Sequence, residues 1–250
     1  MIDAQGFEWS YGGVIRAPRN EKRIALIFTG GDFGEGNEIV LDALQAAGAK
    51  GSFFFTGTYM DKKEFRPHIE RIVREGHYLA PHSHGHLLYA PWDNRDVTLV
   101  NCEEFRKDLE ANLAQIAAFG VPRENSQWWI PPFEWYNDQI SMWSREMGMR
   151  LFNFSPGTLS NADYTEDDDK KFRSSETIYK SILNCDDLKP NGLSGFLLLS
   201  HVGSSPKRTD KFYLRLGTLL KDLKLRGYSF SRVDELLAQC PLEPPKKSED

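Results

Sequence analysis

The 250-residue sequence lacks the features of membrane-spanning and disulfide-stabilised proteins. It has no run of about 20 apolar residues, the length that a membrane-spanning helix needs. Its three cysteines, Cys102, Cys185 and Cys240, are far apart and form no CxxC pair, so they indicate neither a zinc knuckle nor a disulfide framework. The first residues have neither a basic start nor an apolar stretch, so we expect no signal peptide there.

The chain also has fewer basic than acidic residues. The chain has 31 Lys and Arg residues against 36 Asp and Glu residues, a formal net charge of −5. A nucleic-acid partner needs a basic surface to bind phosphates, so this balance disfavours one. The composition, 40% hydrophobic and 27% charged, is typical of a globular protein with a sizeable core. It leaves the oligomeric state open.

The chain shows no internal repeat and no linker that would divide it. We therefore expect one domain over residues 1–250, with its core at about 24–237 and a flexible, Pro- and charge-rich tail at 241–250. The acidic stretch at 161–175 is interpreted as a solvated loop, except around Asp163.

Short apolar segments alternate with amphipathic ones along this core. Seven segments predict strands: 24–28, 51–55, 77–80, 127–130, 150–154, 196–200 and 228–233. Helical spacing of apolar residues predicts helices at 37–47, 62–75, 105–116, 138–147 and 212–223. Strand–helix alternation predicts an α/β fold with a parallel sheet, and seven strands favour a distorted (β/α)7 barrel over an open sheet.

Polar residues follow these strands, at the end of a barrel where active sites lie. The candidates are Asp32 after the first strand, His82, His84 and His86 after the third, Glu134, Trp135 and Tyr136 after the fourth, Asp163 after the fifth, and His201 and Arg208 after the sixth. Each loop thus brings a possible ligand, acid or base to one face of the molecule.

His82 and His86 are the clearest metal-binding candidates. They are four residues apart, so one helical turn or a tight loop can direct both imidazoles at one ion. If the segment is helical, His84 points elsewhere. Two histidines and one carboxylate form a common hydrolytic metal site, and Asp32 is the natural third ligand. The alternative is that these are ordinary surface or core histidines. The acid after the first strand and His201 after the sixth favour the metal site.

The other candidates also have two interpretations. His201 is either a buried structural histidine or, at the barrel mouth, a general acid or base. Trp135 and Tyr136, beside Glu134, are either core residues or a surface that stacks on a sugar ring. Arg208 either lines the mouth or caps the final helix.

In this order, the motifs resemble those of the polysaccharide deacetylases, carbohydrate esterase family 4, over about residues 24–237. The family's H-S/T-x-x-H motif is matched by His82 to His86, which implies that these two histidines bind the metal. Its final L-x-H motif is matched by Leu199 to His201, which implies that His201 is the catalytic acid. The resemblance implies a distorted (β/α) barrel, a divalent metal, foremost Zn²⁺, and removal of acetyl groups from N-acetylated sugars.

Two family motifs are altered. In the pattern T-F-D-D-G, the first Asp is the base and the second binds metal, but Thr29 and Gly30 occupy those positions here. In the pattern R-P-P-Y, the Arg that braces the base is replaced by Ile130. Both the base and the Arg that orients it are therefore absent, and the nearest acidic residue to the first motif is Asp32.

These losses leave several interpretations open. A rebuilt site would use Glu134 as the base, with Asp163, near the family's fourth motif, as the alternative. Otherwise the protein is a carbohydrate-binding pseudoenzyme, or an O-acetyl esterase on the same fold. The retained His201 and the acidic mouth favour a rebuilt deacetylase. The resemblance implies an acetylated carbohydrate partner and a periplasmic, extracellular or cell-envelope location, while a cytoplasmic one stays open.

Overall fold

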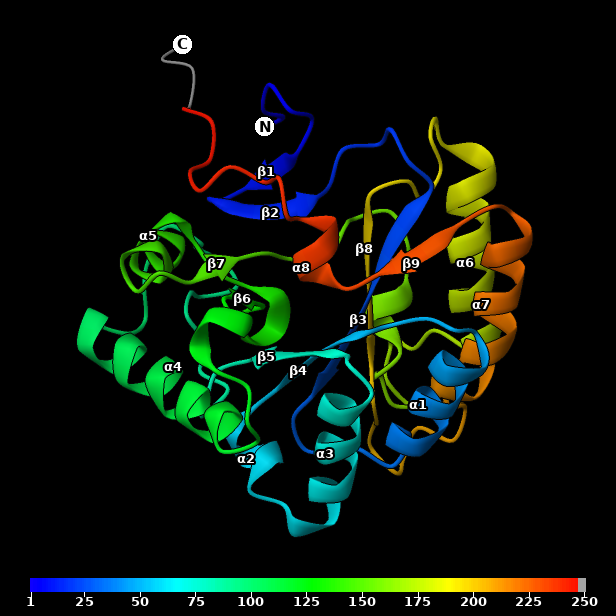
Figure 1. Cartoon of the computed structure of the whole chain (residues 1–250), viewed down its shortest axis with the longest axis horizontal. Helices are drawn as coiled ribbons and strands as arrows, with labels where there is room; N and C mark the ends of the chain where they lie inside the picture. Colours follow the sequence, from blue (N-terminus) through cyan, green and yellow to red (C-terminus); the bar gives the residue numbers. More distant parts are fainter. Residues whose placement is uncertain (247–250) are drawn as a thin grey trace.

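The computed structural model describes residues 1–246, and Figure 1 shows a central sheet surrounded by helices. All seven expected strands are present: β3 (Arg23–Gly30), β4 (Ser52–Phe55), β5 (Tyr78–Pro81), β6 (Trp128–Trp129), β7 (Arg150–Leu151), β8 (Phe196–His201) and β9 (Ser229–Ser231). The α-helices are α1 (Asn37–Ala46), α2 (Gly57–Met60), α3 (Arg66–Arg74), α4 (Cys102–Ala117), α5 (Asp138–Glu146), α6 (Ser175–Leu188), α7 (Leu216–Leu225) and α8 (Val233–Leu236). Among residues 1–246, no helix is both long and apolar enough to span a membrane.

The central sheet is parallel, as the alternation of elements predicts. Its strand order is β5-β4-β3-β8, with β9 also paired to β3, and β6 pairs in parallel with β7. β3 is buried along nearly its whole length, which explains its continuous apolar sequence. The α/β fold of the sequence analysis is therefore confirmed.

The strands follow the order of a (β/α)7 barrel, although backbone ladders do not close it within the described residues. Side chains bridge two of the gaps. Between β5 and β6, the Tyr78 hydroxyl accepts a hydrogen bond from the Trp128 amide at 2.8 Å. Between β7 and β8, the Ser155 amide donates to the Leu197 carbonyl, and the Ser155 hydroxyl accepts from the Leu197 amide at 2.9 Å. This makes the barrel a distorted one.

An N-terminal hairpin covers the amino ends of the strands. Its strands, β1 (Glu8–Ser10) and β2 (Gly13–Arg16), lie with α8 at the end of the molecule where the N-terminus is seen (Figure 1). Phe7 and Trp9 are buried in the same cluster as the inward-facing Ile27 and Leu197. Apolar closure of this end leaves the carboxyl ends of the strands as the mouth of the barrel.

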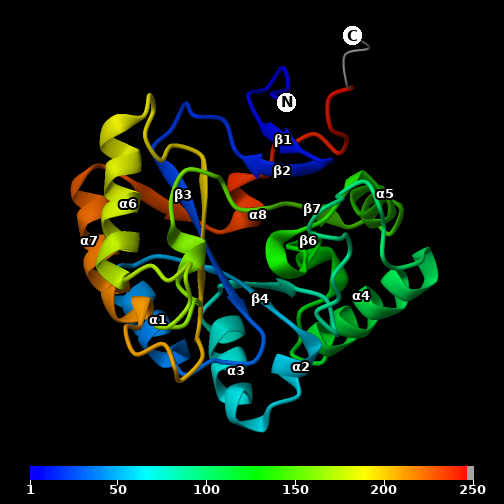
Figure 2. The same cartoon turned by 180° about the vertical axis from the view of Figure 1, so that it is seen from behind.

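Two helical layers cover the outside of the strands. Figure 2 shows α6 and α7 side by side on one flank and α4 and α5 on the other. Helix α6, which the sequence analysis did not identify, buries Ile178, Ile182 and Cys185 at helical spacing. Ser174 caps it by accepting from the Thr177 amide. In the expected tail, residues 241–246 form no helix or strand, and residues 247–250 lie outside the described part.

Candidate functional site

The carboxyl ends of β3, β5 and β8 place candidate side chains at the mouth. Thr29 is in register with His201 on β8 and with Phe54 on β4. Phe54 and Ala80 belong to the inner cluster, so Thr29, His201 and His82, two residues beyond Ala80, face inward by strand alternation. The fold therefore brings together residues that lie far apart in the sequence.

His82 is held in one orientation at the mouth. Its Nδ1 lies 2.8 Å from the Ile130 carbonyl oxygen, and its backbone amide donates to Asn112 Oδ1 at 2.9 Å. A carbonyl only accepts, so Nδ1 carries the proton and the Nε2 lone pair is left for a ligand. Burial, with the nearby His86 as a lesser cause, lowers the pKa of His82 well below its ordinary value, so the ring is neutral.

His86 faces His82, with ring centroids 5.2 Å apart. Burial lowers the pKa of His86 to about 4, against the opposing effect of the Asp32 carboxylate. Two neutral imidazoles suit Zn²⁺ or another divalent transition-metal ion. The chemistry of this pair therefore fits the metal that the resemblance implies.

The third metal ligand remains a prediction. Asp32 is exposed on the loop after β3, close enough for its charge to act on His86. Over residues 1–246, however, no three His, Cys, Asp or Glu side chains form a cluster that could hold a metal ion. The structure thus brings His82 and His86 together but does not bring Asp32 into a ligand triad with them.

His84 points away from the pair, although the segment is a loop and not the helix on which that expectation depended. Its Nδ1 lies 3.1 Å from Gln115 Oε1, and its ring occupies the space where a Cβ on Gly57 would lie. Its backbone amide donates to Asp108 on α4, which also accepts from the Ser83 hydroxyl and the Gly85 amide. Sequence reasoning missed Asp108 because it lies on a different element from the loop that it holds.

His201 forms a hydrogen-bonded pair with Asp163. The two Asp163 carboxylate oxygens lie 2.6 Å from His201 Nδ1 and 2.8 Å from the His201 backbone nitrogen. Burial alone lowers the pKa of His201, but the charge of Asp163 and its hydrogen bond outweigh burial and raise it. A histidine of raised pKa suits a proton donor. Because both oxygens of Asp163 hold His201, this arrangement favours a positioning role for Asp163 over that of a base.

Glu134 lies at the same mouth on a strained turn. Phe133 and Glu134 have left-handed φ angles of 57° and 52°, and Asn153 Nδ2 donates to the Glu134 carbonyl at 2.7 Å. Burial, with the charge of Asp163 adding to it and His201 opposing it, raises the pKa of Glu134 to about 7. A carboxyl group that titrates near neutrality suits general-base chemistry.

The end of β3 carries no acidic side chain at the two altered positions. The buried Thr29 hydroxyl has no hydrogen-bond partner among the described residues. At Gly30, a Cβ would lie 2.9 Å from Phe55, Tyr59 and Val202 side-chain atoms. Gly30 therefore packs against the outer layer, and a carboxylate there would require these neighbours to move.

The three residues expected to bind substrate differ in exposure. Trp135 is partly buried, with its indole N–H donating to the Pro91 carbonyl at 3.2 Å. Tyr136 is fully buried and donates to the Ser10 carbonyl, so it packs in the core. Arg208 is also fully buried and donates to the carbonyls of Thr165 and Arg173, so it holds their loop. For Tyr136 the structure thus favours the core position over a sugar-stacking surface. Arg208 holds a loop, which differs from both of its expected roles, lining the mouth or capping the final helix.

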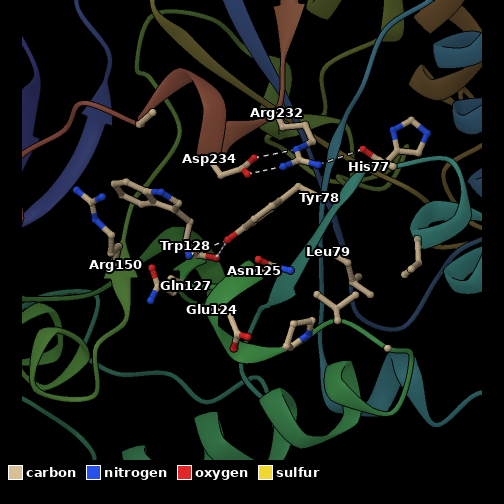
Figure 3. Close-up of a pocket in the computed structure, with 16 residues that line it drawn as sticks. His77, Tyr78, Leu79, Glu124, Asn125, Gln127, Trp128, Arg150, Arg232 and Asp234 are labelled. Atoms are coloured by element: carbon tan, nitrogen blue, oxygen red, sulfur yellow. Dashed lines mark hydrogen bonds and ion pairs between the residues drawn. The ribbon is translucent and has the colours of Figure 1, made fainter.

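A cavity of about 480 Å³ lies elsewhere, near the amino ends of β5 and β6 (Figure 3). Arg232 forms an ion pair with Asp234 there, and Arg150 lies over the ring of Trp128. The histidines and carboxylates of the mouth do not line it. We therefore place the candidate active site at the mouth.

Comparison with known proteins agrees with the motifs. The family model for polysaccharide deacetylase matches residues 16–152, more than half of the chain. A 30.6 kDa uncharacterised protein of Geobacillus stearothermophilus is 25% identical, covering 96% of this chain and 82% of that protein. A peptidoglycan-N-acetylglucosamine deacetylase of Bacillus cereus is 25% identical, covering 88% of this chain and 90% of that protein. The Listeria monocytogenes deacetylase PgdA is 26% identical over 88% of this chain, which spans only 40% of PgdA.

Solved structures share the fold. PdaA of Bacillus subtilis, described as a family 4 carbohydrate esterase, superposes with a TM-score of 0.71 at 21% identity, covering 92% of this chain and 87% of PdaA. BA3943 of Bacillus anthracis, described as a family 4 pseudoenzyme, superposes with a TM-score of 0.66 at 19% identity, covering 92% of this chain and 70% of BA3943. At these identities, the likeness concerns the fold alone.

Proposed function

Since the chain belongs to the polysaccharide deacetylase family, we propose that it is a metal-dependent hydrolase that removes acetyl groups from N-acetylated sugars. The observation that carries the proposal is the grouping at one mouth of the neutral pair His82 and His86, the Asp163-bound His201, and Glu134 with a pKa near 7. Relatives named as peptidoglycan-N-acetylglucosamine deacetylases support N-acetylglucosamine within a cell-envelope glycan as the substrate.

The proposed mechanism assigns one task to each group. His82 and His86, with Asp32 as the proposed third ligand, would hold a divalent ion such as Zn²⁺, which supplies Lewis-acid polarisation of the acetyl carbonyl and of water. The Glu134 carboxylate accepts a proton from the water that attacks the carbonyl carbon. His201 gives its proton to the nitrogen as the C–N bond breaks, which leaves acetate and the free amine. Asp163 holds the His201 ring in place through its Nδ1 hydrogen bond.

The test is acetate release from N-acetylglucosamine oligomers and from peptidoglycan. We expect release by the metal-loaded wild type, its loss in His82→Ala, and a loss of about 10²–10⁴-fold in Glu134→Gln. His68→Ala, on α3, serves as a control that should retain activity. If His82→Ala and Glu134→Gln released acetate at the wild-type rate, the proposed site would be wrong.

A second candidate is a carbohydrate-binding protein without hydrolysis. The observation that favours it is the end of β3, where Thr29 and Gly30 provide no carboxylate and Gly30 has no room for one. Sugar binding without acetate release, measured on N-acetylated and O-acetylated oligomers, would support this candidate and exclude an esterase for those substrates.

A further inference from the structure

The segment that carries the partner of His201 is irregular. Residues 163–173, which we call the strap, lie between η4 (Ser160–Ala162) and α6 and form no helix or strand. Asp163, at the start of the strap, holds the His201 ring and the His201 backbone amide through its two carboxylate oxygens. Because the strap lacks the hydrogen bonds of a helix or a ladder, contacts with other segments must determine where Asp163 lies.

Arg208 is a buried anchor of the strap. It lies in the loop that follows β8, and its side chain is fully buried. Its Nη1 donates to the Thr165 carbonyl at 2.8 Å, and its Nη2 donates to the Arg173 carbonyl at 2.9 Å. A planar guanidinium holds two acceptors in a fixed geometry. One side chain thus binds the strap close to Asp163 and again at its last residue.

The burial of Arg208 has no opposite charge to offset it. Within residues 1–246, its hydrogen bonds go to Thr165 and Arg173 and none goes to a carboxylate, while its Nε is buried without a partner. The guanidinium carbon lies 5.0 Å from the centre of the Phe172 ring. Burying a charge in this way is costly, and an apolar side chain of similar size would cost less if the position served packing alone.

Other contacts between the strap and the same loop lie at the surface. Lys207, which is exposed, forms an ion pair with Glu166 at 3.2 Å. The exposed Asp167 accepts from the Thr209 hydroxyl at 2.6 Å. Exposed ion pairs of this kind contribute little to the position of a segment. The buried contacts of Arg208 are therefore better suited to fix the start of the strap.

We propose that Arg208 is a positioning residue for the proton donor: by binding the strap at Thr165 and Arg173, it keeps Asp163 against His201. The loop that follows His201 thereby folds back and holds the partner of His201 in place. Arg208 acts through Asp163 and does not act on the substrate. The inference rests on the proposed function, because the placement of Asp163 matters for catalysis only if His201 is the proton donor.

The charges around His201 give the proposal a measurable sign. The titratable and charged groups that face His201 are Asp163, Glu134, Tyr164, Arg208, His82 and His86. Burial lowers the pKa of His201, the charge and hydrogen bond of Asp163 raise it, and the charge of Arg208 lowers it by less than Asp163 raises it. Loss of the Arg208 charge alone would therefore raise the pKa, whereas loss of Asp163 from the pair would lower it.

The test is the pKa of His201, measured by NMR titration of the full chain loaded with Zn²⁺. Arg208→Met keeps much of the size of the side chain but removes both donors and the charge. We expect the pKa of His201 to fall in this variant, because Asp163 leaves the pair. Lys207→Met removes the neighbouring exposed charge and is the matched control, in which the pKa should not change. In Arg208→Met, kcat for acetate release should also fall by up to about 10²-fold with KM little changed.

A second comparison uses the Asp163→Asn background. There, Arg208→Met should no longer lower the pKa of His201, because the two residues act through the same contact. A role of Arg208 in stability alone would leave the pKa of His201 where it is in the wild type. If Arg208→Met does not fold, Arg208→Lys replaces it, since Lys keeps the charge but lacks the planar guanidinium, and a fall in the pKa is again expected.

The outcomes separate this inference from the proposed function. A pKa of His201 that rose or stayed unchanged in the Arg208 variant would overturn the inference, because Asp163 would then keep its place without Arg208. If the wild type released no acetate but the pKa fell in the Arg208 variant alone, the proposed function would fail and the positioning of Asp163 by Arg208 would stand. A fall of equal size in Lys207→Met would also overturn it.

Discussion

At the scale of single residues, Glu134 and His201 have pKa values shifted by different surroundings. Burial raises the pKa of Glu134 to about 7, and the charge and hydrogen bond of Asp163 raise the pKa of His201 against the effect of burial. As the proposed base, Glu134 must be deprotonated, and as the proposed acid, His201 must be protonated. Activity should therefore rise as pH increases through about 7 and fall again as His201 loses its proton.

Asp163→Asn tests the His201 pair. The variant keeps the size of the side chain but removes the charge, so the pKa of His201 should fall and the alkaline limb of kcat/KM against pH should move to lower pH. We expect the rate at the optimum to drop by about 10²–10⁴-fold, the size of a general-acid contribution. Asp168→Asn, an exposed change in the same loop, is the matched control. An alkaline limb that stayed in place would show that Asp163 does not tune His201.

Glu134→Gln tests the raised pKa without any substrate. Because the folded-state pKa of about 7 is above the ordinary value of 4.5, the protonated carboxyl stabilises the fold at low pH. That stabilisation is full below about pH 4.5 and is lost as pH rises through 7. Gln does not titrate, so the stability of the variant lacks this pH dependence. The difference in unfolding free energy, variant minus wild type, should therefore be about 1–3 kcal/mol larger at pH 8 than at pH 4. Urea denaturation at pH 4 and at pH 8 measures these free energies. If the unfolding free energies of the two proteins changed equally between the two pH values, the raised pKa of Glu134 would be contradicted.

At the scale of elements, helix α4 holds the loop that carries the two histidines. Asp108 accepts from the Ser83 hydroxyl and from the amides of His84 and Gly85, at 2.5 to 2.9 Å. Ser83 and His86 have left-handed φ angles of 70° and 52°, which such residues rarely adopt by themselves. The loop conformation therefore depends on the helix.

Asp108→Asn should loosen this loop. The amide group of Asn has one acceptor oxygen where the carboxylate has two, so the three donors, among them the buried Ser83 hydroxyl, cannot all keep their partners. We expect about 1–3 kcal/mol less unfolding free energy. Affinity of the metal-free protein for Zn²⁺, measured by calorimetry, should fall about 10- to 100-fold, as for other changes behind metal ligands. Glu103→Gln, exposed in the first turn of the same helix, is the control. Equal Zn²⁺ affinities of Asp108→Asn and the wild type would show that the loop keeps its shape without α4.

At the scale of the whole molecule, side-chain hydrogen bonds join segments that no backbone ladder connects. The buried Ser155 hydroxyl donates to the Ile15 carbonyl at 2.5 Å and accepts from the Leu197 amide, so it joins the hairpin, the segment after β7, and β8. Arg16 donates to the carbonyls of Gly192 and Ser194, which ties the hairpin to the turn before β8. The hairpin is thus part of the barrel and more than a cover for it.

Ser155→Ala removes this junction and leaves a buried N–H and a buried C=O without their side-chain partner. The unfolding free energy should fall by about 1–3 kcal/mol, measured by urea denaturation. Ser229→Ala, an exposed serine in β9, should have little effect. Equal stabilities of the two variants would show that the gap between β7 and β8 closes by packing alone.

The strands could be predicted from the sequence, whereas one helix and the N-terminal hairpin could not. The central parallel strands β3, β4, β5 and β8 are buried on both faces, so they are largely apolar segments. The shorter strands β6, β7 and β9 were found as well, although β9 is only partly buried. Helix α6 was missed because the sequence analysis treated the acidic stretch before it as a loop and did not follow the apolar positions beyond. The hairpin was missed because β1 and β2, three and four residues long, are too short to show a pattern.

The sequence by itself determined the family and the parallel strands and indicated His82 and His86 as a pair, because motifs and apolar runs can be recognised locally in the sequence. Only the tertiary structure decided that Asp163 binds His201, that Tyr136 and Arg208 are buried, and that Asp108 holds the histidine loop. These contacts join residues 20 or more positions apart, and burial, charge and hydrogen-bond geometry depend on which elements the fold brings together.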